Sequence, residues 1–417
     1  MRKLIVCGVA LVAALALTVP GALGSAEQAG ITPRAITIGG TFPLTGPAAS
    51  YAPIPVGMKA YFSYINARRG PNGKRGINGR QIVWKYYDDG YNPANTVQLT
   101  RRLVEQDRVF ATVGQLGTEH NIAVRPYMNA QKVPQSLVST GASYWGSQYS
   151  QYPWTSGWQP DYIAEGRLYG LHIKANQRGK KIAVLYQNDD YGKDYLYGLK
   201  AALGKAYVDA NVAAEVPFEV TAPTIQAQMV RIRQANAPIF VILATPTPTI
   251  QAYAFGNALS YRPEQIYLNS VSATSAFLNI AVARSSAAYV NNSISMAYTK
   301  DPASPRWNND AAMKQYRQIM AKYAPGVNAN DALYFYGVAK AETFVQAMYK
   351  AGRNPTRAGY QAALNSLNAP NKFLLPGVVQ KTGPRDKFII SQMQLQRFNS
   401  STRVWAPVGP LVEGRPR

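Results

Sequence analysis

The chain has 417 residues, too many for one ordinary hydrophobic core, so its length favours two domains. It carries 44 Lys and Arg against 21 Asp and Glu, a formal charge of +23, but the basic residues are scattered and form no runs typical of nucleic-acid contacts. The single cysteine excludes a disulfide framework, and the presence of only two histidines argues against histidine-based metal or acid–base chemistry.

The N-terminal segment has the pattern of a secretory signal peptide. Two basic residues precede an apolar stretch over residues 4–19, and small residues follow it. We expect residues 1–24 to be removed by cleavage after Gly24, with Ala26 as the next choice. Cys7 lies inside this stretch, too early to carry a lipid anchor. The sequence therefore predicts a soluble protein of the periplasm without a thiol.

From residue 35 the chain alternates short apolar strands with amphipathic helices, in two consecutive runs. The first run predicts strands over 35–40, 81–87, 109–113 and 133–138, and helices over 56–67, 95–106 and 118–130. The second predicts helices over 164–175, 192–208, 225–235 and 248–259, and strands over 181–186, 212–220, 238–243 and 265–268. This alternation indicates parallel sheets built from βαβ units, hence an α/β fold of two doubly wound lobes.

We expect both lobes to contain segments that are distant in sequence. The proposed division assigns residues 27–155 plus 297–374 to lobe 1, and 156–296 plus 375–417 to lobe 2. Three hinge crossings are expected near 154–158, 294–297 and 374–377, a connection that permits closure on a ligand. Open sheets of this kind bind ligands beyond the carboxyl ends of their strands.

Several short motifs occur along the chain in a fixed order. They are ITIG at 36–39, PLTGP at 43–47, GINGR at 76–80, DDGYNP at 88–93, VG at 113–114, STGAS at 139–143 and QNDDYGKD at 187–194. With these motifs the chain resembles the periplasmic Leu/Ile/Val-binding protein family, the type I solute-binding proteins of ABC importers. The resemblance implies a monomer that captures a small molecule between its lobes and delivers it to an ABC permease in the inner membrane.

The resemblance also implies how a ligand carboxylate is held. Thr118 matches the hydroxyl that the family places at a helix start, where free N–H groups favour an anion. Gly141, Ala142 and Ser143 match a segment whose backbone approaches the ligand closely. The alternative for Thr118 is a plain N-cap, and the two functions are compatible.

Aromatic residues are expected to cover the rest of the ligand. Tyr51 and Tyr191 stand where the family places rings on opposite sides of the cleft, and Tyr334 or Tyr336 is a third candidate. A tyrosine offers a flat apolar face with a hydroxyl at its end. Thr245 and Val271, in two uncharged strand-end segments, complete the predicted ligand-binding set.

The sequence departs from amino-acid binders of the family in one respect. Those proteins meet the ligand ammonium with an acidic residue in the second lobe, whereas the matching segments 244–248 and 268–274 contain no carboxylate. A buried, unpaired ammonium is costly. We therefore expect a small carboxylate without an α-amino group, an aromatic acid in view of the tyrosines. Leu, Ile, Val or another apolar amino acid is the alternative, with Glu119 supplying the charge.

Other classes of protein fit less well. Asp88 and Asp89 precede a glycine, so a turn explains them better than paired catalysis. No nucleophile elbow, HExxH helix or phosphate-binding loop is present, so we expect no enzyme activity, no cofactor and no metal. We interpret the basic surface as solvated, without nucleic acid as a partner; attraction of anions or of an acidic partner is the alternative. A ligand-sensing receptor component is the competing function.

Overall fold

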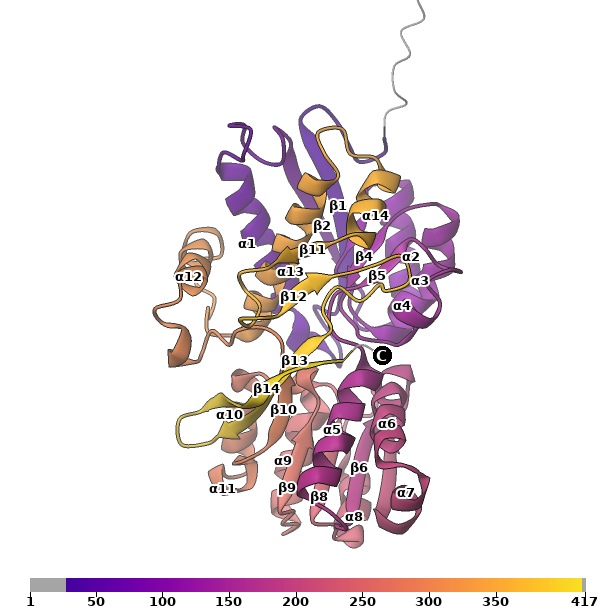
Figure 1. Ribbon diagram of the computed structural model, residues 1–417, viewed down its shortest axis with the longest axis vertical. Coiled ribbons are helices and arrows are strands. Elements are labelled where there is room, and N and C mark those ends of the chain that lie inside the picture. The colour runs from indigo at the N-terminus through magenta and orange to yellow at the C-terminus, as the bar shows by residue number, and fades with distance from the viewer. Residues whose placement is uncertain (1–27, 415–417) are drawn as a thin grey trace, which may run out of the picture.

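The two runs of alternating elements form two separate sheets, which lie one above the other in Figure 1. The computed structural model describes residues 28–414; the predicted signal peptide lies outside them. One sheet has five strands in the order β2-β1-β3-β4-β5, all paired in parallel. The other has seven strands in the order β14-β13-β10-β9-β8-β6-β7. The expected α/β fold with two doubly wound parallel sheets is confirmed.

The half that contains the five-stranded sheet is built from two stretches of the chain. Its first stretch comprises β1 (Ala35–Phe42), η1 (Ala49–Tyr51), α1 (Pro53–Ala67), β2 (Gln81–Asp88), α2 (Pro93–Glu105), β3 (Thr112–Val113), α3 (Thr118–Ala130), β4 (Gln135–Val138), α4 (Tyr144–Ser147) and β5 (Thr155–Gly157). The second comprises η3 (Pro305–Trp307), α12 (Ala311–Tyr323), α13 (Ala332–Lys350), α14 (Arg357–Asn365) and the small hairpin β11 (Asn368–Pro370) and β12 (Val379–Lys381).

The half that contains the seven-stranded sheet takes the middle of the chain and the last hairpin. Its elements are α5 (Tyr162–Asn176), β6 (Ile182–Gln187), α6 (Asp190–Leu203), α7 (Lys205–Asn211), β7 (Val212–Phe218), α8 (Gln226–Ala235), β8 (Ile239–Leu243), α9 (Pro246–Ala258), β9 (Gln265–Leu268), η2 (Ser270–Ser272), α10 (Ser275–Arg284), α11 (Ala287–Val290), β10 (Ile294–Ala297), β13 (Gln392–Asn399) and β14 (Val404–Glu413). The inner strand β8 is buried at all five positions, as a parallel strand covered on both faces should be.

Helices α5 and α6 pack closely because glycines face the partner backbone. A Cβ at Gly166 would lie 2.2 Å from the carbonyl oxygen of Tyr195, and one at Gly198 would lie 2.1 Å from that of Ile163. Only glycine permits such an approach. The contact fixes the N-terminal ends of both helices, which carry Tyr162 and Tyr191, at the boundary between the two sheets (Figure 1).

Within residues 28–414 the chain passes between the sheets three times, after β5, after β10 and before β13. The first and third passages run side by side: Gly157 N donates to Lys387 O at 3.0 Å, and Ile390 N donates to Trp158 O at 3.1 Å. The third passage therefore lies near 387–391, beyond the expected 374–377. Leu374 bridges to Thr299 beside the second passage, but the chain then returns through β12 to its own half.

Two further local features differ from or add to the expectations. The helix expected over 192–208 is broken at Gly204, whose φ of 81° ends α6 before α7 begins. In the part of the chain from 28 to 414, no helix combines the length and apolar character that a membrane span requires.

Candidate functional site

A cavity of about 110 Å³ lies between the carboxyl ends of the strands of the two sheets. Since one water occupies roughly 10–15 Å³ of such a space, it has room for on the order of ten non-hydrogen atoms. Many of the residues at its wall come from the ends of β3, β4, β8, β9 and β10, and the rest come mainly from the first turns of helices such as α3, α5, α6 and α13 and from the hairpin of β13 and β14. This is the position at which doubly wound sheets bind small molecules.

Five of the predicted ligand residues lie in the wall of this cavity: Tyr51, Thr118, Tyr191, Thr245 and Val271. They come from both sheets, and two of them meet across the boundary, because the Tyr51 hydroxyl donates to the Val271 carbonyl at 3.2 Å. The structure thus brings together residues that are up to 220 positions apart in the sequence.

The predicted segment Gly141–Ala142–Ser143 lies beside the cavity and not in its wall. A Cβ at Gly141 would lie 2.1 Å from the carbonyl oxygen of Pro160, so the glycine serves contact with the first passage between the sheets. Ala142 is fully buried, and Ser143 donates its N–H and hydroxyl to Asp194 at 2.7 and 3.0 Å. At this strand end the wall is formed by the two residues that precede Gly141, which are Ser139 and Thr140.

Helix α13 presents Tyr336 to the cavity rather than Tyr334. Ala332, Leu333 and Tyr336 contribute to the wall, at helical spacing. Tyr334 follows Leu333 directly and precedes Tyr336 by two residues, which turns it away from the face that they share. Its backbone packs instead on α1, where a Cβ at Gly57 would lie 2.2 Å from the Tyr334 carbonyl oxygen.

Helix α3 begins at the cavity with its first N–H groups uncapped. Gly117, with φ of 104°, is the N-cap residue and offers no side chain, and Thr118 is the first helical residue. The Thr118 hydroxyl lies 2.6 Å from the Thr140 hydroxyl, so it acts within the cavity wall and does not cap the helix. Free N–H groups and the helix dipole favour an anion at such a position.

Most other helix starts at the cavity are already satisfied by carboxylates. Asp161, Asp189 and Asp331 cap α5, α6 and α13, respectively, by accepting backbone N–H groups. Helix α9 resembles α3 in this respect, because its N-cap residue Thr245 makes no capping bond and donates to Gln187 at 3.0 Å. The start of α3 is therefore free for a ligand, whereas Pro246 and Pro248 leave only the N–H of Thr247 available in the first turn of α9.

Tyrosines dominate the aromatic part of the wall: Tyr51, Tyr91, Tyr162, Tyr191, Tyr298 and Tyr336. Burial raises the pKa of each of these phenols, so they are neutral and can donate a hydrogen bond at physiological pH. The rings also order one another, as in the T-shaped pair of Tyr162 and Tyr191 with centroids 5.2 Å apart.

The family assignment agrees with this geometry. The periplasmic binding protein family matches residues 35–403. The chain belongs to this family. Membership implies a solute-binding protein that acts outside the cytoplasm.

Individual relatives are distant. Leu/Ile/Val-binding protein homolog 3 of Brucella melitensis biotype 1 is 24% identical over 209 residues, which cover 49% of this chain and 53% of that protein. The chain thus spans about half the length of this curated relative. A branched-chain amino acid ABC transporter protein from Thermus thermophilus with bound valine has a TM-score of 0.76 at 14% identity, covering 92% of this chain and 97% of that one. A fatty acid ABC transporter substrate-binding protein from Thermomonospora curvata has a TM-score of 0.76 at 18% identity, covering 93% and 95%.

The carboxylates nearest to the cavity have partners of their own. Asp301, in the wall, accepts from Ser275 Oγ at 2.5 Å and Ala303 N at 2.9 Å, and burial raises its pKa. Glu119 accepts from the backbone N–H of Asp190 at 3.0 Å, across the boundary between the sheets. The sequence-based alternative, in which Glu119 meets a ligand ammonium, would require that contact to break.

Two buried charged residues near the cavity escaped the sequence analysis. Glu165 accepts from the hydroxyls of Tyr169 and Tyr195, and from both the N–H and the hydroxyl of Ser270, which lies in the cavity wall. Lys340 is fully buried on α13. Glu165 and Lys340 each lie on the buried face of a helix. A charged residue among the apolar residues of such a face is the signal in the sequence that could have identified them. Within residues 28–414 no three His, Cys, Asp or Glu side chains gather in a metal-binding arrangement.

Proposed function

We propose that this chain is the periplasmic solute-binding protein of a branched-chain-amino-acid-type ABC importer, and that its ligand is a small carboxylate without an α-amino group, such as an aromatic acid. The observation that carries the proposal is the uncapped start of α3, where Thr118 and Thr140 place hydroxyls beside free N–H groups in the cavity wall. A carboxylate accepts from such donors with charge-assisted hydrogen bonds.

The known ligands of fold neighbours support the carboxylate and leave the ammonium open. Valine, bound in the protein from Thermus thermophilus, and a fatty acid, named for the one from Thermomonospora curvata, share a carboxylate but not an amino group. In the present chain Asp301 and Glu119 are engaged with other donors. An ammonium buried in this cavity would have to share Asp301 or Glu119 with these donors, whereas a ligand without an amino group needs no such partner.

We further infer that the two halves act as lobes that close on the ligand about the three passages. With the passages as observed, lobe 1 comprises residues 28–157 and 301–386, and lobe 2 comprises 158–300 and 387–414. The hydrogen bonds of Tyr51 with Val271, Glu119 with Asp190, and Ser143 with Asp194 join the lobes. Closure that forms such contacts lets the permease distinguish loaded protein from empty protein.

The test is a thermal-shift screen followed by titration calorimetry on residues 25–417. The protein is first unfolded, dialysed and refolded to remove any co-purified ligand. We expect stabilisation by aromatic or aliphatic monocarboxylates and little by Leu, Ile or Val. Tight binding of Leu or Val, with none of the simple acids, would contradict the proposed ligand class.

A further inference from the structure

Lys340 lies fully buried directly behind the cavity wall. Its side chain has no solvent exposure, and its Nζ donates to the hydroxyls of Ser139 and Tyr336, both of which line the cavity. The ammonium also lies 4.4 Å from the centroid of the Tyr336 ring and 5.2 Å from that of Trp158. Among residues 28–414 no carboxylate forms an ion pair with it.

The direction of the hydrogen bonds around Lys340 follows from simple donor and acceptor counting. Nζ donates to both hydroxyls, and in its ammonium form, which a nearby anion favours, Lys340 only donates, so Ser139 and Tyr336 then accept from it. The Ser139 hydroxyl donates its own proton to the carbonyl oxygen of Gly114 at 2.7 Å. The Tyr336 hydroxyl donates its proton to Oε1 of Gln159, also at 2.7 Å.

Gln159 continues the same order of donors and acceptors as far as Tyr162. Because its Oε1 accepts from Tyr336, its amide nitrogen faces Tyr162 and donates to that hydroxyl at 3.1 Å. Tyr162 therefore accepts from Gln159 and keeps its own proton. That proton is left for the hydroxyl of Thr140, with which Tyr162 also interacts, or for a ligand in the cavity.

The chain of four residues thus begins at a cation and ends at a donor beside the uncapped start of α3. Thr140, next to Tyr162, is also the residue that meets Thr118 at 2.6 Å. Burial lowers the pKa of Lys340 well below its ordinary value, which means that its charge is costly unless an anion is near.

We propose that Lys340, acting through Tyr336 and Gln159, fixes the Tyr162 hydroxyl as a donor to the ligand carboxylate and supplies the positive charge that selects an anionic group. Lys340 is a positioning residue: it contacts the wall, and Tyr162 contacts the ligand. This inference rests on the proposed function for the location of the carboxylate, but it does not depend on whether the ligand also carries an amino group.

The experiment measures the affinity of three carboxylate probes by calorimetry: benzoate, 4-methylpentanoate and leucine. The variants are Lys340→Met, Tyr162→Phe and the double variant, with Lys350→Met as the matched control. Lys350 lies on the same helix but is exposed and donates to the carbonyl of Ser366. Circular dichroism and the unfolding temperature report whether each variant folds.

For every probe that the wild-type protein binds, we expect Lys340→Met and Tyr162→Phe each to weaken binding by about tenfold to a hundredfold, the range for a lost hydrogen bond to a charged group. The double variant should lose little more than Lys340→Met alone, because that variant already removes both the positive charge and the fixed orientation of the Tyr162 donor. Lys350→Met should bind as the wild type does.

The outcomes separate the two proposals. Binding of leucine alone, lost in Lys340→Met, would refute the proposed ligand class and uphold Lys340. Unchanged affinity in Tyr162→Phe, or additive losses in the double variant, would refute the hydrogen-bond chain and leave the ligand class standing. Tyr162→Phe retains the ring that stacks on Tyr195 at 4.5 Å, so it tests the inference even if Lys340→Met does not fold. Binding of none of the probes would overturn both.

Discussion

The substitution Thr118→Val tests the proposed carboxylate site most directly. Thr118 is 3% exposed, and its hydroxyl contacts the hydroxyl of Thr140 at the start of α3. Valine has nearly the same shape, so the packing remains and the hydroxyl alone is lost. Thr118→Ser is the matched control, because it keeps the hydroxyl and removes only a methyl group.

The expected magnitudes differ for stability and for binding. Thr140 still accepts from the N–H of Ala142 at 3.3 Å, so the loss in the empty protein is that of one neutral hydrogen bond, about 1 kcal/mol. For a chain of this size that lowers the unfolding temperature by on the order of 1 °C. A hydrogen bond to a carboxylate contributes about 1.5–3 kcal/mol, which corresponds to a roughly 10- to 150-fold loss of affinity.

Calorimetric titration of refolded protein with the acid selected by the screen measures the difference. We expect Thr118→Val to bind at least tenfold more weakly, and Thr118→Ser to stay within about threefold of the wild type. Wild-type affinity in Thr118→Val would refute the reasoning that the start of α3 holds the carboxylate. Attention would then move to Thr245, at the other uncapped helix start.

Two further predictions concern stability. Glu165→Leu removes an acceptor for four donors, the buried hydroxyls of Tyr169 and Tyr195 and two groups of half-buried Ser270, and should lower the free energy of unfolding by about 3–5 kcal/mol in urea denaturation; a loss below 1 kcal/mol would contradict this. Burial raises the pKa of Asp194 from 3.8 to about 6, so the stability linked to its protonation is present below 3.8 and is lost as the pH rises through 6. The unfolding temperature of the wild type should therefore fall relative to that of Asp194→Asn between pH 4.5 and 7, and a constant difference would refute the assignment.

The fold could be predicted because hydrophobic periodicity is a local property. The buried run of β8 and the amphipathic pattern of α3 are visible in windows of a few residues. The third passage between the sheets could not be located in this way. Two apolar segments lie near Gly377, and either could have crossed between the sheets. Only the pairing of β12 with β11 shows that the first of them stays in the half with the five-stranded sheet.

The same distinction between local patterns and long-range contacts applies to the residues of the site. The place of Thr118 and Tyr191 in the wall was predictable because each stands at a strand-to-helix turn that is visible in the sequence, Thr118 at the start of a helix and Tyr191 within QNDDYGKD. The offset from Gly141 to Thr140, and from Tyr334 to Tyr336, depends on which residue of a turn or helix faces inward. The contacts of Lys340 were not predictable, since Ser139, which accepts from it, lies 201 positions earlier, and Gln159, which accepts from Tyr336, lies 177 positions before that tyrosine.

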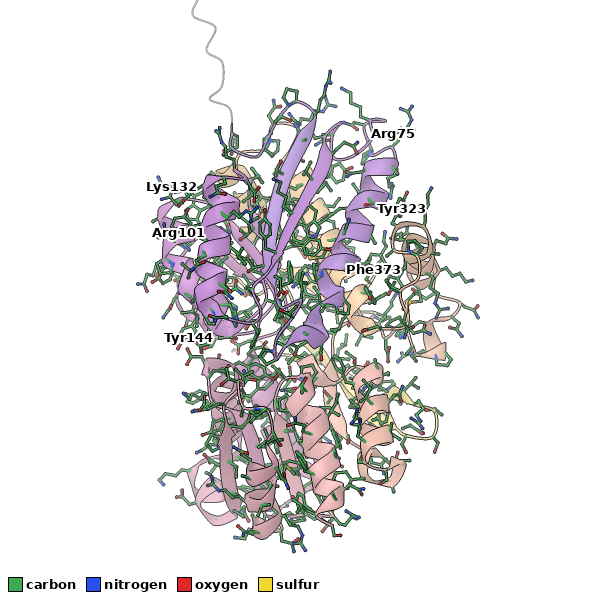
Figure 2. The ribbon with its side chains drawn as sticks, turned by 180° about the vertical axis from the view of Figure 1, so that it is seen from behind. Arg75, Arg101, Lys132, Tyr144, Tyr323 and Phe373 are labelled. Atoms are coloured by element: carbon green, nitrogen blue, oxygen red, sulfur yellow. The ribbon has the colours of Figure 1, made fainter. Side chains whose placement is uncertain are left out.

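Under the proposed function, the first turn of α3 connects ligand capture to closure through adjacent residues. Thr118 lies in the cavity wall, and Glu119, roughly 100° further round the helix, accepts from the N–H of Asp190 at the start of α6 on the opposite side. Figure 2 shows Tyr144 at the same level, where the two halves meet, and its hydroxyl interacts with Asp190. A ligand that orders this turn therefore also orders a contact between the halves. This arrangement explains why a glutamate can stand beside an anion site. The Glu119 carboxylate accepts from the start of the opposite helix, and in the proposed complex the ligand carboxylate accepts from the donors of α3.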